Sequence, residues 1–248
     1  MLRWGLSFWR YFLDGTPVYL ARHYWWAYLW RPAIWFFDHQ IVINAILFGQ
    51  YNRLLDRTMT CLEGRPAGRF LQLTCVYGRL TPHLVQYLGN EPLYLLDVAP
   101  AQLETSRLKI PEENRGQLLA MRMNAEYLGL SKDSFSTVLI FFLMHEMPGD
   151  ARRRVLSEAV RVLKPGGRLV ITEYGMEPGA HCLYRFWPIR KLLLRYEPFL
   201  EGFWREDTAA LLQVEAEPHG KQVELTRSQG IFNDFYRVMV FRIEGSAD

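Results

Sequence analysis

The stretch FLQLTCVYGRL, residues 70–80, decides the fold of this chain. It begins as an apolar run typical of a buried strand, passes through a turn of small residues and continues into a helical pattern. A strand, a tight turn and a helix in this order are typical of nucleotide-binding units in open α/β sheets. Such a turn usually holds several glycines, whereas this one holds Gly78 preceded by Val76 and Tyr77. The stretch therefore predicts an α/β fold whose binding turn is altered.

The rest of the chain continues this alternation, because short β-like runs and helical patterns follow one another from Arg69 onward. We expect seven strands, at residues 69–75, 92–98, 117–123, 136–142, 167–174, 221–228 and 234–243. Helices are expected at 81–88, 100–109 and 150–163, the last one ending at the sequence KPGG. The last two strands lie close together, so the predicted fold is a Rossmann-like, mainly parallel sheet with an antiparallel pair at one edge.

Length and composition fit one domain with appendages, since the chain has 248 residues, of which 50% are apolar. The formal net charge of +3 is small and the basic residues form no long block, which argues against a nucleic-acid partner. The three cysteines, Cys61, Cys75 and Cys182, fit neither a zinc spacing nor a disulfide framework. We expect free thiols in a reducing compartment.

The first 37 residues form a local aromatic specialisation, with six of the eight tryptophans: Trp4, Trp9, Trp25, Trp26, Trp30 and Trp35. The same stretch carries Arg3, Arg10, Arg22 and Arg31 against the single acid Asp14. Tryptophan with arginine is favoured at membrane interfaces, so we expect contact with a membrane surface, although the aromatics could instead pack on the domain as a lid. Charged residues and Pro32 interrupt every candidate spanning run, and no signal-peptide pattern is present.

Domain boundaries follow from these shifts in composition. We expect a membrane-associating helical extension over residues 1–50 and a Rossmann-like catalytic domain over residues 51–248. Within that domain, residues 175–211 interrupt the alternation and include the basic, aromatic segment LYRFWPIRKLLLRYEPFL. This segment resembles the extension in composition, and we interpret it as a helical cap over the site.

Ligands of open α/β sheets bind beyond the carboxyl ends of the strands, so the residues at those ends are the candidates for chemistry. These ends hold the turn 74–78, Asp97 with Val98, Asn124 with Ala125, His145 with Glu146, and Glu173 with Tyr174. Asp97 suits two hydrogen bonds from ribose hydroxyls, and its alternative role is to cap the helix that begins near Pro100.

Three motifs in order carry a family resemblance: LLDVAP at 95–100, MNAEYLGLSKDSFSTVLIFFLMHEMP at 123–148 and EAVRVLKPGGRLVITEY at 158–174. With them the chain resembles the class I S-adenosylmethionine-dependent methyltransferases and, among these, the quinone-biosynthesis C-methyltransferases. The resemblance implies that fold and S-adenosylmethionine as cofactor. It implies a ribose role for Asp97, adenine contacts from Asn124, Ala125 and Glu126, and further cofactor contacts from Thr74, Val76, Tyr77, Gly78, Val98 and Phe141.

The first motif departs from that family, because Gln72 stands where the family has an acid and Val76 where it has a glycine. One interpretation is that the site has decayed and the protein is a non-catalytic relative. Against this, Asp97, Asn124 and the later strand ends still align with the motifs of the family. The altered turn with an aromatic N-terminus is also similar to the rhodoquinone-biosynthesis (RquA) family. That narrower resemblance implies replacement of a methoxy group of ubiquinone by an amino group, with S-adenosylmethionine as amino donor and manganese as metal.

The altered turn offers a chemical reason for amino transfer. In a methyltransferase the first-strand acid helps to keep the ammonium group of the cofactor protonated, and Gln72 removes this charge while Val76 adds desolvation. A neutral amine is a nucleophile toward a methoxyquinone. We expect Tyr77 to hydrogen-bond the amine or a quinone oxygen, its alternative role being to fill space.

A metal near the quinone oxygens would favour the addition. Candidate ligands are His145, Glu146, Glu173 and, on the cap, His181, although the first two could simply start the next helix. The predicted catalytic set is Gln72, Tyr77, His145 and Glu173, the last as metal ligand or general base. Asp133 is most simply a turn residue that could border the adenine.

The leading functional hypothesis is therefore an enzyme that aminates ubiquinone to rhodoquinone. The alternatives are a C- or O-methyltransferase acting on a quinone or lipid, and a non-catalytic scaffold for quinone biosynthesis. The expected location is peripheral, on the cytoplasmic face of a bacterial inner membrane or the matrix face of a mitochondria-like organelle. The oligomeric state is not predicted.

Overall fold

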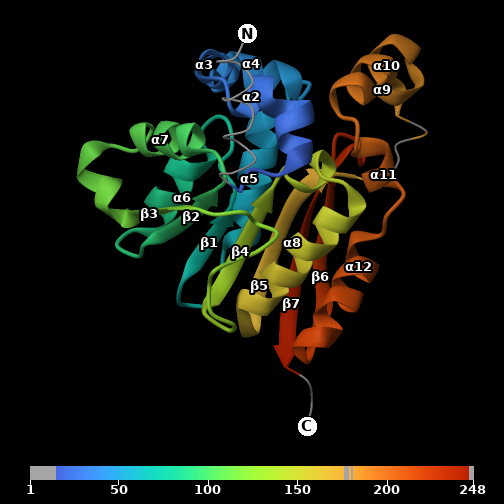
Figure 1. Ribbon diagram of the computed structural model, residues 1–248. Coiled ribbons are helices and arrows are strands. Elements are labelled where there is room, and N and C mark those ends of the chain that lie inside the picture. Colours follow the sequence, from blue (N-terminus) through green and yellow to red (C-terminus); the bar gives the residue numbers. More distant parts are fainter. Residues whose placement is uncertain (1–14, 176–178, 180, 246–248) are drawn as a thin grey trace.

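A computed structural model describes residues 15–175, 179 and 181–245 of the chain (Figure 1). Part of the predicted aromatic extension, with Trp4, Trp9, Arg3, Arg10 and Asp14, lies outside the described residues. So do residues 176–178 and 180 of the predicted cap.

The centre of the molecule is a seven-stranded sheet with the strand order β3-β2-β1-β4-β5-β7-β6. The strands are β1 (Phe70–Leu73), β2 (Leu93–Asp97), β3 (Leu118–Arg122), β4 (Phe135–Phe141), β5 (Leu163–Tyr174), β6 (Lys221–Ile231) and β7 (Tyr236–Gly245). The first five strands pair in parallel, and β7 runs antiparallel to both β5 and β6. The predicted class I methyltransferase fold, with its antiparallel edge, is confirmed.

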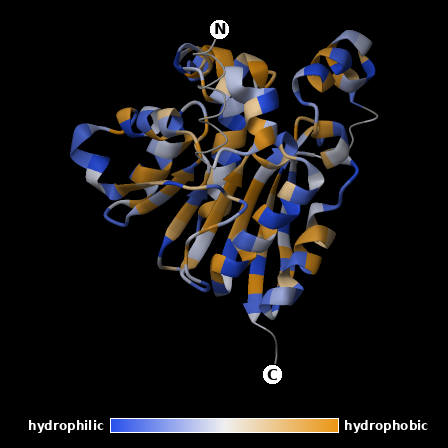
Figure 2. Ribbon diagram, viewed as in Figure 1, coloured by the Kyte–Doolittle hydropathy of each residue, from blue (hydrophilic) through white to orange (hydrophobic). Residues whose placement is uncertain are grey.

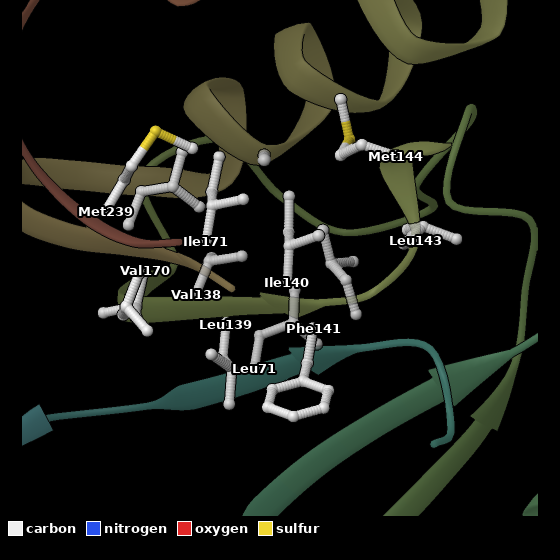
Figure 3. Packing of buried hydrophobic residues seen from close by; sticks show 14 of the residues in the cluster. Leu71, Val138, Leu139, Ile140, Phe141, Leu143, Met144, Val170, Ile171 and Met239 are labelled. Atoms are coloured by element: carbon white, nitrogen blue, oxygen red, sulfur yellow. The ribbon is translucent and has the colours of Figure 1, made fainter. Parts of the chain in front are cut away.

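The central strands are apolar runs because both of their faces are covered. Every residue of β1 and β4 is buried, as expected for strands with helices on either side. Figure 2 shows this as a hydrophobic centre of the sheet. Figure 3 shows Val138 and Ile140 of β4 beside Ile171 of β5, with Met144 near the adjoining helix. Burial of such side chains is the main source of the fold's stability.

Crossover helices connect the parallel strands, and their bounds lie close to those predicted. They are α6 (Leu80–Leu88), α7 (Pro100–Leu108) and α8 (Gly149–Val162). Helix α8 ends at Val162, one residue before the predicted end, whereas β5 begins four residues earlier than expected, so that residues 164–167 lie inside it as an irregularity. Leu163 pairs with Phe135 and Arg168 with Thr137, so four residues of β5 stand opposite Ser136.

Two groups of helices cover the carboxyl end of the parallel strands, and the last helix of each group continues alongside the sheet (Figure 1). The N-terminal group begins with a π-helical turn (Leu20–Tyr24) and continues with α2 (Trp25–Tyr28), α3 (Arg31–Phe37), α4 (Gln40–Ile46) and α5 (Tyr51–Leu62). The second group, in the predicted cap, is α9 (Cys182–Arg185), α10 (Trp187–Tyr196), α11 (Leu200–Trp204) and the start of α12 (Thr208–Ala216). Within the described ranges, no helix combines the length and apolarity that a membrane crossing requires.

Candidate functional site

A cavity of about 570 Å³ lies at the carboxyl ends of the strands, beneath the two helix groups. Its volume is within the usual range for small-molecule sites. The walls are mainly apolar and come from the N-terminal helices, from α10 and from the strand ends. Its polar lining includes two groups of side chains, which we call the donor pole (Thr74, Asp97 and Asn124) and the acceptor pole (His145, Glu146 and Glu197).

Asp97 is the centre of the donor pole and comes from the last position of β2. Its two carboxylate oxygens accept hydrogen bonds from the backbone N–H groups of Cys75 (2.8 Å) and Ala99 (2.7 Å). Burial raises the pKa of Asp97 to about 6, and the two N–H donors oppose this rise. The carboxylate at the end of β2 thus keeps acceptor positions that ribose hydroxyls could use as hydrogen-bond donors.

Other predicted cofactor residues lie at or just after the ends of β2, β3 and β4. The predicted residues Val98, Asn124, Ala125 and Phe141 all line the cavity. Asn124 also accepts the backbone hydrogen of Glu126 at 2.9 Å, which fixes the amide. Glu126 itself is absent from the cavity wall and pairs instead with Arg154 and the hydroxyl of Tyr19.

The turn after β1 is shaped by its contacts with the N-terminal helices. Gly78 has a φ of +81°, and a Cβ there would collide with the ring of Tyr51. Its N–H donates to Asp38 at 2.9 Å. The Tyr77 hydroxyl donates to the carbonyl of Ala27 at 2.6 Å. The altered turn therefore holds the N-terminal segment in place.

Tyr77 and Gln72, two of the predicted catalytic residues, occupy different places. The Tyr77 ring lines the cavity and stacks on Tyr28 with ring centroids 5.7 Å apart. Gln72 is fully buried behind the turn and does not line the cavity. Its amide donates to the carbonyl of Thr74 at 3.0 Å and accepts from the Thr81 hydroxyl at 3.1 Å. Gln72 can thus affect a ligand through the turn, without touching it.

The acceptor pole is built on a 3₁₀ turn, Met144–Glu146, that follows β4. His145 is buried, and its Nδ1 lies 3.0 Å from both carboxylate oxygens of Glu173. Glu173 also accepts the backbone hydrogens of Met144 (2.7 Å) and Tyr174 (2.9 Å). This arrangement turns Nε2 of His145 toward the carboxylates of Glu146 and Glu197, each 3.8 Å away.

Two tyrosines of the N-terminal segment close the acceptor pole. Tyr28 donates to Glu146, and Tyr24 donates to Glu197 at 2.9 Å. Burial disfavours a charge on His145, but Glu173 and the two other carboxylates outweigh it and raise its pKa to about 9. Burial raises the pKa of Glu146 to about 8, opposed by the His145 charge. The pole is thus a buried, proton-binding cluster.

The side chains of the acceptor pole could act as ligands of a divalent cation. One ligand atom each from His145, Glu146 and Glu197 lie within 4.8 Å of one another. An imidazole and two carboxylates suit a hard or borderline ion, and a carboxylate on the far nitrogen, here Glu173, is the usual support of a metal-binding histidine. Glu173, predicted as a ligand, therefore stands behind the histidine.

Sequence reasoning missed Glu197, although a signal was present: it is the one acid in the basic segment 183–200. His181, predicted as a fourth candidate ligand, caps α9 by accepting from the N–H of Leu183. Its ring packs on Phe232 and Phe235 and lies outside the cavity wall. Asp133 pairs with Lys221 away from the site, in agreement with a turn role.

Known proteins resemble this chain over part of its length. The family described as "Methyltransferase domain" matches residues 70–167. The ubiquinone/menaquinone biosynthesis C-methyltransferase UbiE of Vibrio parahaemolyticus is 30% identical over 54% of this chain and 52% of the relative. The demethylmenaquinone methyltransferase of Lactococcus lactis is 32% identical over 53% of this chain and 52% of the relative. The chain thus spans about half the length of these relatives.

Solved structures agree on the fold. A SAM-dependent methyltransferase from Methanosarcina mazei superposes with a TM-score of 0.52 at 18% identity, over 72% of this chain and 93% of that one. At this identity the likeness shows the fold alone. Together the comparisons support an S-adenosylmethionine-dependent methyltransferase fold related to quinone C-methyltransferases.

Proposed function

We propose that the protein transfers a group from S-adenosylmethionine to the ring of a lipophilic quinone. The observation that carries this proposal is one mainly apolar cavity that holds both poles: Asp97 of the donor pole lies at the end of β2, His145 of the acceptor pole follows β4, and β1 lies between these two strands. The donor pole has the residues that a nucleoside requires, and the acceptor pole has a charged, buried cluster suited to the oxygens of a quinone ring. The relatives named as quinone methyltransferases support the same substrate class.

The order of the strands gives the orientation of the donor molecule. The sheet order is β3-β2-β1, so Asn124, Asp97 and the turn from Thr74 lie at successive strand ends. With ribose on Asp97, the adenine lies toward Asn124 and Ala125, and the methionine end lies against the turn. The next strand, β4, leads to His145, so the methionine end faces the acceptor pole.

A divalent cation, manganese by the family resemblance, fits the acceptor pole. His145, Glu146 and Glu197 would hold it, and Glu173 would orient the histidine. When bound, the cation would draw electron density from a quinone oxygen and make the ring more electrophilic. Tyr24 and Tyr28 would keep water from the carboxylates.

The group transferred, in our proposal, is the amino group. The amine nitrogen bonds to the ring carbon that carries a methoxy group, the bond from that carbon to oxygen breaks, and methanol leaves with the amine proton. Tautomerisation then passes two electrons from the donor's α-carbon to the ring, and water releases an aminohydroquinone and an α-keto acid. The altered turn favours this reaction, because Gln72 brings no negative charge that would keep the amine protonated.

Methyl transfer to a quinone is the second candidate, and the comparisons favour it over amino transfer. The similar proteins are C-methyltransferases, and the donor pole retains Asp97 and Asn124 in the cavity. In this reaction the sulfonium methyl group would face the acceptor pole, and the turn would serve only to seat the methionine end.

We also propose that the protein receives its quinone at a membrane surface, in keeping with the peripheral location expected above. The segments that roof the cavity carry apolar side chains toward the cavity and toward solvent. Leu192 and Tyr196 of α10 line the cavity and are also exposed. Three tryptophans of the same segments are largely exposed: Trp30 (55%), Trp35 (68%) and Trp187 (60%). Residues 182–196 carry Arg185, Arg190, Lys191 and Arg195 and no acid. Exposed tryptophans with basic side chains suit an anionic lipid surface.

Calorimetric binding tests the two-pole assignment. We expect S-adenosylmethionine to bind, Asp97→Ala to abolish that binding, and Glu197→Gln to leave it within about threefold of wild type. For a short-tail ubiquinone in the presence of manganese we expect the reverse: Glu197→Gln should abolish its binding, and Asp97→Ala should leave it nearly unchanged. Loss of donor binding in Glu197→Gln but not in Asp97→Ala would contradict the assignment.

A further inference from the structure

The carbonyl oxygens of the turn after β1 are occupied by donors from the chain itself. The Thr74 oxygen accepts from the Gln72 amide at 3.0 Å, and the Tyr77 oxygen accepts from the Tyr51 hydroxyl at 3.4 Å. Thr74 has a φ of +72°, a strained value for a residue with a side chain, and the Gln72 bond holds it there. The Gln72 amide thus fixes this end of the turn. An ionised acid at position 72 could not donate this hydrogen bond.

Lys109 satisfies the other end of the turn. Its ammonium group donates to the carbonyls of Val76 (3.2 Å) and Gly78 (2.9 Å) and to the carboxylate of Asp38 (2.7 Å). An ammonium has three hydrogens, and these three acceptors use all of them. Lys109 reaches the turn from the end of α7 and does not line the cavity.

Because Lys109 already occupies this end of the turn, the turn has little capacity to bind the ammonium group of a ligand. A carbonyl oxygen has two lone pairs, but a cation on the second lone pair of Val76 or Gly78 would stand beside the charge of Lys109. The carboxylates beside the turn have other partners, since Asp38 pairs with Lys109, and Asp97 accepts two backbone hydrogens and, in the proposed function, the ribose hydroxyls. Of the five carbonyls from Thr74 to Gly78, four already have a donor.

We propose that Gln72 and Lys109 are specificity-determining residues that deny the donor's amino group its acceptors on the turn and leave it uncharged for reaction at the acceptor pole. This inference rests on the proposed function, because it takes S-adenosylmethionine as the donor with its methionine end against the turn. An amine without anionic or carbonyl partners in an apolar cavity loses the interactions that favour its charged form.

The test compares the affinity for S-adenosylmethionine with that for its analogue in which hydrogen replaces the α-amino group. For the wild-type protein we expect the two dissociation constants to agree within about threefold. In Gln72→Glu, where Thr74 loses its donor and a negative charge appears, S-adenosylmethionine should bind at least about tenfold more tightly than the analogue. Gln86→Glu adds the same charge on the exposed side of α6 and should behave as wild type.

Lys109→Met is a second variant that buries no new charge, and it should shift the ratio in the same direction by freeing two carbonyls. A wild-type protein that already prefers S-adenosylmethionine about tenfold over the analogue would overturn the inference and leave the proposed function standing. An unchanged ratio in both variants would overturn it as well. Binding of neither compound by the wild type would overturn the proposed function and this inference with it.

Discussion

Glu173 and His145 form the fixed centre of the acceptor pole: both carboxylate oxygens lie 3.0 Å from Nδ1 of the imidazole. Because Glu173 is fully buried and also accepts two backbone hydrogens, it cannot reach a ligand in the cavity. It acts through the histidine, whose Nε2 it directs at Glu146 and Glu197. Glu173 is thus a positioning residue, in place of the general base that the sequence had suggested as one option.

The first prediction concerns metal binding at this pole. Glu197→Gln removes a ligand, and Glu173→Gln removes the support of the histidine, so both should weaken manganese binding by about 10- to 100-fold. Electron paramagnetic resonance of free manganese during a titration measures this. Glu201→Gln, on the exposed side of α11, is the control. Unchanged manganese affinity in both variants would remove the metal site from the account.

The second prediction is a pH dependence of donor binding set by Asp97. Burial raises its pKa to about 6, so the carboxylate is protonated below this value and loses its capacity to accept from ribose hydroxyls. The affinity for S-adenosylmethionine should therefore be constant above about pH 7 and fall below pH 6. In Asp97→Asn the affinity should be lower throughout and the fall between pH 7 and 5 should disappear. A fall that persists in Asp97→Asn would assign it to another group.

The stability of the protein should respond to the same group in the opposite sense. The folded-state pKa of Asp97 lies above its ordinary value, so the cost of burying the carboxylate is present above pH 6. This cost is relieved as the pH falls from 6 toward the ordinary pKa. Asp97→Asn should flatten that part of the stability curve, measured by urea unfolding.

The third prediction concerns the turn glycine. Gly78→Ala combines a positive φ with a collision against Tyr51, and we expect it to destabilise the protein by about 2 kcal/mol or more. Gly89 is a matched control, with a φ of +61° and open space around a Cβ. Gly89→Ala should lower the free energy of unfolding by only about 1 kcal/mol, the cost of placing alanine at a positive φ. Equal urea midpoints for the two variants would contradict the packing of Tyr51 against the turn.

The fourth prediction concerns the exposed side of α10. Replacing Trp187 by Ser together with Arg190 and Lys191 by Glu should abolish flotation with anionic liposomes, because these side chains supply the apolar and basic contacts. Leu225→Ser, on strand β6, is the control for loss of an exposed apolar side chain. Flotation of the triple variant equal to that of wild type would exclude α10 as the membrane contact.

Much of the fold could be predicted from the sequence because parallel strands buried on both faces leave uninterrupted apolar runs, as β1 and β4 do. Asp97 could be placed for a related reason, because it ends the largely buried strand β2, whereas Asn124 follows the more exposed edge strand β3. The KPGG sequence indicated the end of the helix to within one residue but not the start of the strand, which begins at Leu163, before the glycines.

The acceptor pole could be predicted only in part. His145 follows β4, but Glu197 comes from the cap, and no local pattern indicates which cap residue will fold onto a strand end. The clamp of Lys109 on the turn escaped prediction for the same reason, since Asp38 lies 71 residues away from it in sequence. Contacts between distant segments depend on tertiary packing, which periodicity does not report.

The central claim is that the protein transfers the amino group of S-adenosylmethionine to a quinone. The most direct measurement is mass spectrometry of the quinone after incubation with manganese and a donor that carries nitrogen-15 in its amino group and deuterium in its methyl group. The account predicts a product that has gained nitrogen-15, lost a methoxy group and gained no deuterium. A product that has gained the deuterated methyl group without nitrogen-15 would contradict the account and establish methyl transfer instead.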